Sequence, residues 1–265
     1  MRNSKRYFYP DDHKDLSHLS KFYLENTIAS RSWVNPFSTT KIWFPPISGP
    51  MDNLVTVCNG LDWVRYLKNY NFHNQTKVKF LDYNIMSLEF INRLIYEWDG
   101  IDYIEFLESF GNEKVNHLNM NWDSLYGLKD HLNERWTSFK LEVDWDIIWK
   151  KIKSQIDFKI EFKDFLHNEI NDHWLDSSYN TQNTLINLSH VYNYHSTSIF
   201  YTLEYRLGLE NYTIEYLKRT VPDAYLIIDG RSWHGFKQYE NHEKSSQVVN
   251  FNTVCLLYTS DAADE

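Results

Sequence analysis

Short apolar runs alternate along the chain with segments in which apolar residues recur at helical spacing. The short runs predict strands at 54–58, 78–82, 159–163, 184–189 and 224–229, with 247–254 as a further candidate. Apolar positions three and four residues apart predict helices at 61–70, 85–98 and 198–219. Because strands and helices alternate and the strand runs are almost continuously apolar, we expect an α/β fold with a doubly wound, mostly parallel sheet.

The middle of the chain, from about 101 to 156, lacks strand signals and predicts helices inserted between the second and third strands. The clearest helix carries Trp145, Ile148, Trp149, Ile152 and Ile156 on one face, a stripe typical of a helix that packs on a core. We therefore predict one α/β domain over 51–254 that contains this insertion. A leader at 1–50 precedes it and ends in the Pro- and Gly-rich stretch WFPPISGP.

The composition favours a packed globular domain. Apolar residues make up 42% and aromatic residues 17% of the chain, which is enough to build a core. No run of about 18 apolar residues occurs, so we expect no membrane span, and the N-terminus lacks the apolar stretch of a secretory signal. The net charge of -9 argues against unspecific nucleic-acid binding, which needs a basic surface.

The last residues, CLLYTSDAADE (Cys255 to Glu265), look like the in-frame translation of a sequencing adapter. On that interpretation the natural C-terminus is missing and the natural sequence continues differently after about Val254, so this tail is left out of the fold prediction. The remaining chain holds one cysteine, Cys58. A single thiol cannot form an internal disulfide, which fits a reducing, cytoplasmic location.

The stretch NLVTVCNGLDWVRYL, residues 53–67, predicts a buried strand, a tight turn at Gly60 and a helix. In parallel sheets ligands bind beyond the carboxyl ends of the strands, and this order of elements is the usual entrance to a nucleotide-type cofactor site. Asp82 ends the next predicted strand, 22 residues after Gly60. A carboxylate there can accept hydrogen bonds from both hydroxyls of a ribose. The alternative is a residue of a solvated loop beside the helix-capping Asn84.

The segment NLSHVYNYHST, residues 187–197, follows the fourth predicted strand and is the chemically densest loop. Its candidate catalytic residues are His190, Tyr194 and His195, and its candidate substrate contacts are Asn187 and Asn193. Either histidine has the chemistry of a general base that removes a proton from the substrate. The alternative is that His190 packs beneath the loop and His195 is solvated.

Two further groups of polar residues are weaker candidates. Arg231 and Trp233, in the stretch DGRSWHG after the fifth strand, either line a substrate pocket or belong to a polar turn with an anchoring Trp. Four potential metal ligands crowd one segment, at His167, Glu169, Asp172 and His173. No second half-site accompanies them, so we predict no metal.

The order of predicted elements over about 53–250 resembles that of class I S-adenosylmethionine-dependent methyltransferases, which have a Rossmann-like sheet. That family carries an acidic residue and then G-x-G-x-G at the end of the first strand. The matching run here is TVCNGLD, residues 56–62. Gly60 matches the middle glycine, Thr56 stands at the position of the acid, and Cys58 and Asp62 replace the outer glycines.

By the same resemblance, Asp82 matches the acid that binds the ribose and Asp164 the acid that meets the adenine amino group. The resemblance implies S-adenosylmethionine as cofactor, bound around Thr56, Cys58, Gly60, Asp82 and Asp164. It also implies methyl transfer to a small or medium-sized acceptor, with the insertion at 101–156 as a lid. One alternative is a non-catalytic binding or assembly module of the same fold, supported by the missing glycines and the missing acid at Thr56. Another is a nicotinamide-dependent oxidoreductase, which the lack of G-x-G-x-x-G disfavours.

Overall fold

The structure is a computed structural model of the chain, and it describes residues 44–58, 60–82, 85–116, 129–163, 165, 174–188, 191, 202–228 and 231–233. Within them one sheet is formed by β1 (Met51–Val57), β2 (Phe72–Asp82), β3 (Asp157–Phe162), β4 (Thr184–Leu188), β5 (Tyr225–Ile228) and β6 (Arg231–Trp233). The spatial order is β3-β2-β1-β4-β5-β6, in which β1 to β5 run parallel and β6 runs antiparallel to β5. The predicted strands of the parallel sheet and the Rossmann-like α/β class are thereby confirmed.

The short strand β6 occupies residues for which we predicted a loop or a polar turn. Its register pairs Ile228 with Arg231 and Leu226 with Trp233, which is the pattern of a tight hairpin. The two connecting residues are Asp229 and Gly230, a dipeptide typical of two-residue hairpin turns. The sequence thus contains a local signal for this hairpin. The further strand predicted at 247–254 lies outside the described residues.

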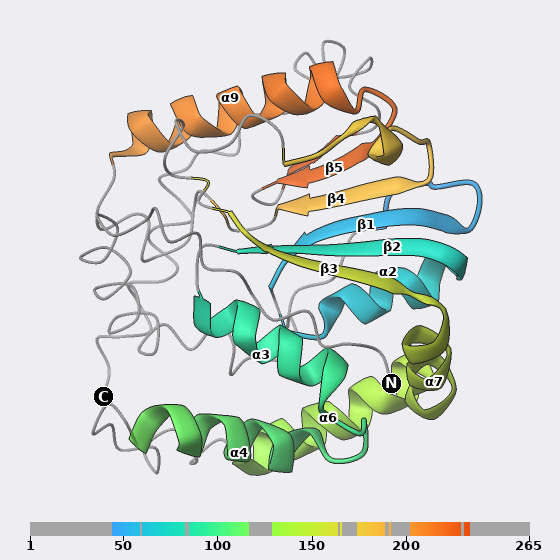
Figure 1. Cartoon of the computed structure of the whole chain (residues 1–265), viewed down its shortest axis with the longest axis vertical. Helices are drawn as coiled ribbons and strands as arrows, with labels where there is room; N and C mark the ends of the chain where they lie inside the picture. Colours follow the sequence, from blue (N-terminus) through green and yellow to red (C-terminus); the bar gives the residue numbers. More distant parts are fainter. Residues whose placement is uncertain are drawn as a thin grey trace.

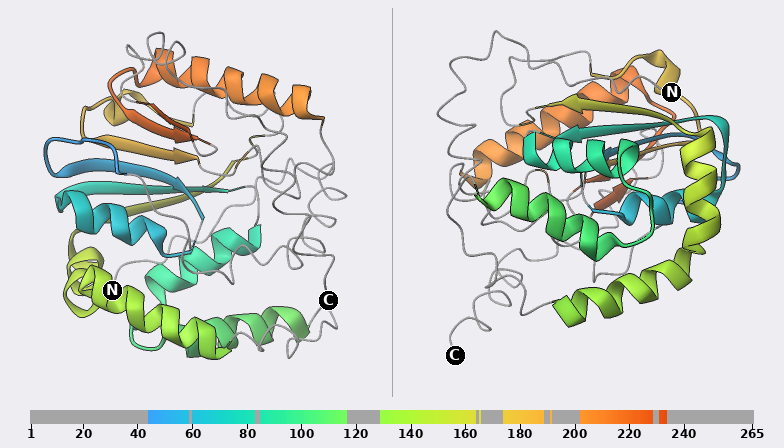
Figure 2. Two further views of the ribbon diagram at one scale, coloured as in Figure 1. Left: turned by 180° about the vertical axis from the view of Figure 1, so that it is seen from behind. Right: turned by 60° about the horizontal axis from the view of Figure 1, so that its bottom comes forward.

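Helices cover both faces of the sheet (Figures 1 and 2). On one face lies α9 (Leu203–Thr220), and on the other lie α2 (Asp62–Tyr70) and α3 (Ile85–Tyr96). The predicted insertion contains α4 (Tyr103–Asn116), α6 (Lys129–Val143) and α7 (Trp145–Gln155). These helices pack with α2 and α3 as a second helical layer. The role of the insertion as a lid over the cofactor stays a prediction.

A cluster of aromatic side chains holds this helical layer together. Trp145 stacks on Trp149 with ring centroids 4.8 Å apart and meets Trp136 edge-on at 5.0 Å. The indole N–H of Trp145 also donates a hydrogen bond to the carbonyl of Gly100, at 2.7 Å. Aromatic pairs of this kind contribute about 0.5–1.5 kcal/mol each beyond the burial of their surface. The apolar stripe predicted on α7 is therefore part of the core.

The strands β1, β4 and β5 are buried on both faces, as a doubly wound sheet requires. In β1, Leu54 packs on the side of α2 while Val55 packs on the side of α9, and both are fully buried. This alternation follows from the two-residue period of a strand. Among the described helices, none combines the length and apolarity needed to cross a membrane.

Candidate functional site

The carboxyl ends of β1, β2 and β4 lie side by side at one edge of the sheet (Figure 1). Val57 of β1 is in register with Leu81 of β2, and the next residues along these strands are Cys58 and Asp82. The chain then turns at Gly60, which has a φ of 52°. Side chains disfavour this left-handed conformation, so glycine suits the turn. The structure thus places Cys58 and Asp82 at the ends of adjacent strands, with the turn at Gly60 two residues after Cys58.

The two residues that replace the outer glycines of the family motif have their side chains in packed surroundings. Cys58 is 5% exposed and belongs to the apolar core beneath α2. Asp62 is also 5% exposed, and its carboxylate accepts a hydrogen bond of 2.7 Å from Arg65. Arg65 in turn donates to Glu142 of α6 at 2.8 and 2.7 Å. Neither replacement therefore leaves an exposed side chain on the glycine turn.

The charge of Asp82 acts on the neighbouring Cys58. Burial raises the pKa of the Cys58 thiol well above its ordinary value, and the nearby charge of Asp82 raises it further. Cys58 is therefore a protonated thiol at neutral pH and is not a nucleophile, because the thiolate is the reactive form. The same coupling means that the Asp82 carboxylate lies close to the end of β1. The backbone N–H of Lys163 donates to the carbonyl of Asp82 at 2.9 Å, which ties the residue after β3 to this edge.

Thr56 and Asn187 were predicted to contact cofactor and substrate, and the structure places both within the sheet. They are in register with each other on β1 and β4, and they are 2% and 6% exposed. The Thr56 hydroxyl donates to the carbonyl of Val57 at 3.2 Å. At the position where the resembled family carries its acid, this chain thus has a buried hydroxyl whose proton is directed at the backbone.

The other predicted site residues are not tested by the structure. Asp164, His190, Asn193, Tyr194 and His195 lie outside the described residues, as do the four potential metal ligands at 167–173. The described residues contain no group of three or more His, Cys, Asp or Glu that could hold a metal ion. Arg231 and Trp233 lie on β6, which β5 and β4 separate from β1.

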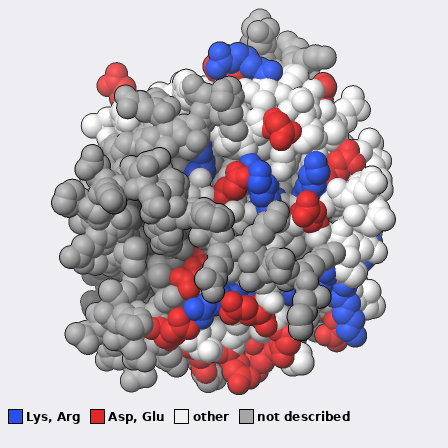
Figure 3. All heavy atoms as spheres, viewed as in Figure 1, with Lys and Arg blue, Asp and Glu red and all other residues white. Residues whose placement is uncertain are grey.

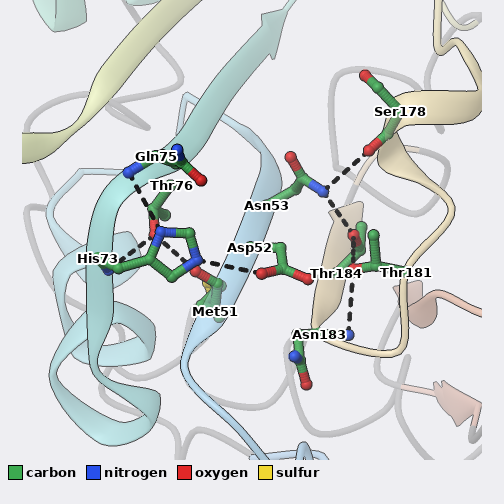
Figure 4. Close-up of polar contacts among 10 residues, drawn as sticks. All are labelled: Met51, Asp52, Asn53, His73, Gln75, Thr76, Ser178, Thr181, Asn183 and Thr184. Carbon is green, nitrogen blue, oxygen red and sulfur yellow. Dashed lines mark hydrogen bonds and ion pairs between the residues drawn. The ribbon is translucent and has the colours of Figure 1, made fainter.

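A polar cluster at the opposite, amino edge of the sheet was not predicted (Figure 4). Asp52 joins its two sides, since one carboxylate oxygen lies 3.1 Å from Nε2 of His73 and the other accepts from Thr181 at 2.8 Å. The Nδ1 atom of His73 accepts from the backbone N–H of Gln75 at 3.1 Å. This contact requires a bare Nδ1, so Nε2 carries the proton and donates it to Asp52. Both ring nitrogens of His73 are thus hydrogen-bonded within the amino edge.

Further hydrogen bonds in Figure 4 fix the register of the strands at the amino edge. Asn53 donates to the hydroxyl of Thr184 at 2.8 Å, which joins β1 to β4. Thr76 donates to the carbonyl of Met51 at 2.6 Å, which joins β2 to β1. A one-residue slip would exchange the two faces of each strand, so such bonds help to specify the sheet. We interpret the amino-edge cluster as structural.

Lys79 is a second polar feature that the sequence analysis missed. It is 3% exposed, and its ammonium lies 2.6 Å from a carboxylate oxygen of Glu161 and donates to the carbonyl of Trp174. Burial lowers the pKa of Lys79, and the hydrogen bond to Glu161 opposes this shift. Because these partners occupy the ammonium, we interpret Lys79 as a clamp that holds the segment at Trp174 on the sheet, and not as a catalytic amine.

Comparison of the sequence with protein-family models and with curated proteins finds no match. The functional interpretation therefore rests on the fold and on the carboxyl edge at Cys58, Gly60 and Asp82.

Proposed function

We propose that the protein binds S-adenosylmethionine at the carboxyl edge of its sheet and transfers the methyl group to a small or medium-sized acceptor. The observation that carries the proposal is the position of Gly60 and Asp82. They lie at the ends of adjacent parallel strands, β1 and β2, in a sheet of order 3-2-1-4-5. A ligand beyond this edge meets the glycine turn and the acid together, which is the arrangement that nucleotide-type cofactors require.

The side chains around the turn fit such a ligand in three respects. Asp82 offers a carboxylate to two ribose hydroxyls, and the protonated thiol of Cys58 adds no second negative charge beside it. The Asp62 carboxylate at the start of α2 is bound by Arg65, so its charge is partly neutralised. Cys58 and Asp62 keep their side chains in the core, so the turn stays open to the close approach that glycine otherwise permits.

When bound, S-adenosylmethionine supplies an electrophilic methyl group on a sulfonium. The described residues would bind and orient it, with Asp82 fixing the ribose and the backbone at Gly60 lying against the ligand. Such positioning supplies much of the rate enhancement in a two-substrate transfer. A base for the acceptor belongs to the residues predicted in 187–197, and its assignment remains part of this proposal.

The proposed acceptor is a small molecule, and the proposed location is the cytoplasm. On the face drawn in Figure 3, the described Lys and Arg side chains lie among Asp and Glu and do not form one basic patch. This distribution and the net charge of -9 speak against a nucleic-acid acceptor. Cys58 is a free thiol, which suits a reducing compartment.

Calorimetric titration with S-adenosylmethionine and S-adenosylhomocysteine tests the proposal. Two charge-assisted hydrogen bonds to the ribose are worth about 1.5–3 kcal/mol each, so Asp82→Ala should weaken binding by about a hundred-fold or more. Asp146→Ala, which removes an exposed acid from α7, is the matched control and should leave affinity unchanged. If the folded wild type takes up neither ligand at about millimolar concentration, the methyltransferase proposal is wrong.

Thr56 favours a second candidate, a binding or assembly module that has lost transfer chemistry. The family carries an acid at this position, and here a buried hydroxyl donates to the backbone instead. A module of this kind would bind neither S-adenosylmethionine nor S-adenosylhomocysteine. Asp82→Ala would then alter neither the titration nor the stability of the protein. The same titration therefore separates the two candidates.

A further inference from the structure

The strand β3 forms one edge of the described sheet. It pairs with β2 over residues 157–162 without a register shift, and no described strand pairs with its other side. The backbone N–H of Lys163 donates toward β2, to the carbonyl of Asp82. Successive residues of a strand direct their N–H and C=O groups to alternate edges. Odd-numbered residues of β3 therefore face β2, and the N–H and C=O of Phe158 and Ile160 lie on the outer edge.

The sequence of this edge is complementary to itself in the antiparallel direction. Around Ile160 it reads DFKIEFK, residues 157–163. A second copy that runs antiparallel and is centred on Ile160 places Lys159 opposite Glu161, twice by symmetry. It also places Phe158 opposite Phe162, and Ile160 opposite its own copy. In an antiparallel pair, residues that exchange two hydrogen bonds must both direct their backbone groups outward, and Ile160 meets this condition in both copies.

We propose that β3 pairs with β3 of a second copy of this chain, antiparallel and centred on Ile160, so that the two sheets become one. The apolar residues of the edge support this pairing. Phe158, Ile160 and Phe162 pack on the core of the α2 face but are only partly buried. In the proposed dimer each of these side chains gains a neighbour from the second copy, which buries more apolar surface.

The charged side chains of β3, Lys159 and Glu161, lie on the opposite face of the sheet from its apolar side chains. They favour the antiparallel pairing. The side chain of Lys159 is 61% exposed and that of Glu161 is 31% exposed, with Nζ and Oε1 2.5 Å apart. Charges on an edge strand often prevent pairing. A single sign along the strand would oppose every register, and a parallel copy in register would place lysine beside lysine. The antiparallel register centred on Ile160 brings the opposite charges together twice by symmetry, which is how isologous C2 contacts are built.

Sedimentation equilibrium of the full 265-residue chain up to about 500 µM tests the proposal. The strand is short, so we expect a reversible dimer with a dissociation constant of about 10–100 µM. Lys159→Glu replaces both cross-strand attractions by repulsions and should weaken the dimer about tenfold or more. Lys150→Glu makes the same charge change at an exposed position of α7 and should leave the dimer unchanged.

A mixing experiment tests the register. Glu161→Lys should also fail to self-associate, while an equimolar mixture with Lys159→Glu should regain the dimer, because each acid then faces a lysine. Glu161 also binds Lys79, so folding of Glu161→Lys must be checked by circular dichroism. If Glu161→Lys does not fold, oxidative cross-linking of cysteine variants that also carry Cys255→Ser tests the register instead. Ile160→Cys lies on the two-fold axis and should cross-link to its own copy, whereas Lys159→Cys should not.

Three results would overturn the proposal. The first is a wild type that stays monomeric at the highest concentration. The second is a dimer that Lys159→Glu leaves unchanged or that Lys150→Glu weakens equally. The third is a failure of both the mixed pair and the Ile160→Cys cross-link.

Discussion

Gly100→Ala should destabilise the protein strongly, because the residue joins α3 to the aromatic layer in a conformation and a space that fit only glycine. Its φ is 86°, and an alanine in such left-handed backbone costs about 1–2 kcal/mol. A Cβ atom at this position would lie 2.1 Å from Cδ1 and from Nε1 of Trp149. Trp149 is 4% exposed and stacked on Trp145, so it cannot withdraw without disturbing the core. Overpacking of this kind costs about 1–3 kcal/mol.

The expected loss in the free energy of unfolding is therefore about 2–5 kcal/mol. Urea denaturation followed by tryptophan fluorescence and by far-ultraviolet circular dichroism measures it. Gly208→Ala in α9 is the matched control, since a Cβ there has nothing within 4 Å. In a helix interior this change should stabilise the fold by about 0.5–1 kcal/mol. A Gly100→Ala protein within about 0.5 kcal/mol of wild type would contradict the packing described for the helical layer.

Three further predictions concern Cys58, Arg65 and Glu161. Burial, and to a lesser extent the charge of Asp82, raise the pKa of the Cys58 thiol. Alkylation of Cys58 by iodoacetamide should therefore be slow in the native protein and faster in Asp82→Asn. Mass spectrometry of the Cys58 peptide measures the rate. Arg65→Met should lower the free energy of unfolding by about 3–5 kcal/mol, because it removes the guanidinium that binds the buried carboxylate of Asp62. Asp62→Asn in the same protein should recover part of this loss, and urea denaturation measures both variants. Burial raises the pKa of Glu161, but its hydrogen bonds to two lysines outweigh this and hold the pKa below its ordinary value. The stability it contributes is then present above its unfolded pKa and lost as pH falls through the lower folded pKa, so the difference in urea midpoint between wild type and Glu161→Gln should shrink from about pH 6 to about pH 3.

Local patterns were sufficient to predict most of the sheet. The apolar runs of β1, β4 and β5 are buried on both faces, so their sequence signal is strong. The apolar stripe of α7 predicted that helix and its buried face equally well. A stripe fixes which face of a helix is buried but not what covers it, so the packing of the insertion on α2 and α3 could not be predicted. Contacts such as that between Trp149 and Trp63, with centroids 6.4 Å apart, join distant segments and decided where the insertion packs.

The candidate site could likewise be predicted from the sequence only in part. Gly60 and Asp82 follow directly from strand ends and spacing, and the structure brings them to one edge. The partners that support this edge could not be predicted, because Arg65 and Glu142 are 77 positions apart in sequence. The clamp at Lys79 depends on Glu161 of a neighbouring strand, and the amino-edge contact between Asp52 and His73 depends on the register of β1 and β2. Such pairs become visible only when the sheet is assembled.

The most direct test of the proposed cofactor site is a crystal structure of the protein with S-adenosylhomocysteine. We expect the two ribose hydroxyls within about 3.2 Å of the carboxylate oxygens of Asp82, with the ligand lying against the turn at Gly60. A ligand bound at another place, or bound at this edge with its ribose away from Asp82, would contradict the account.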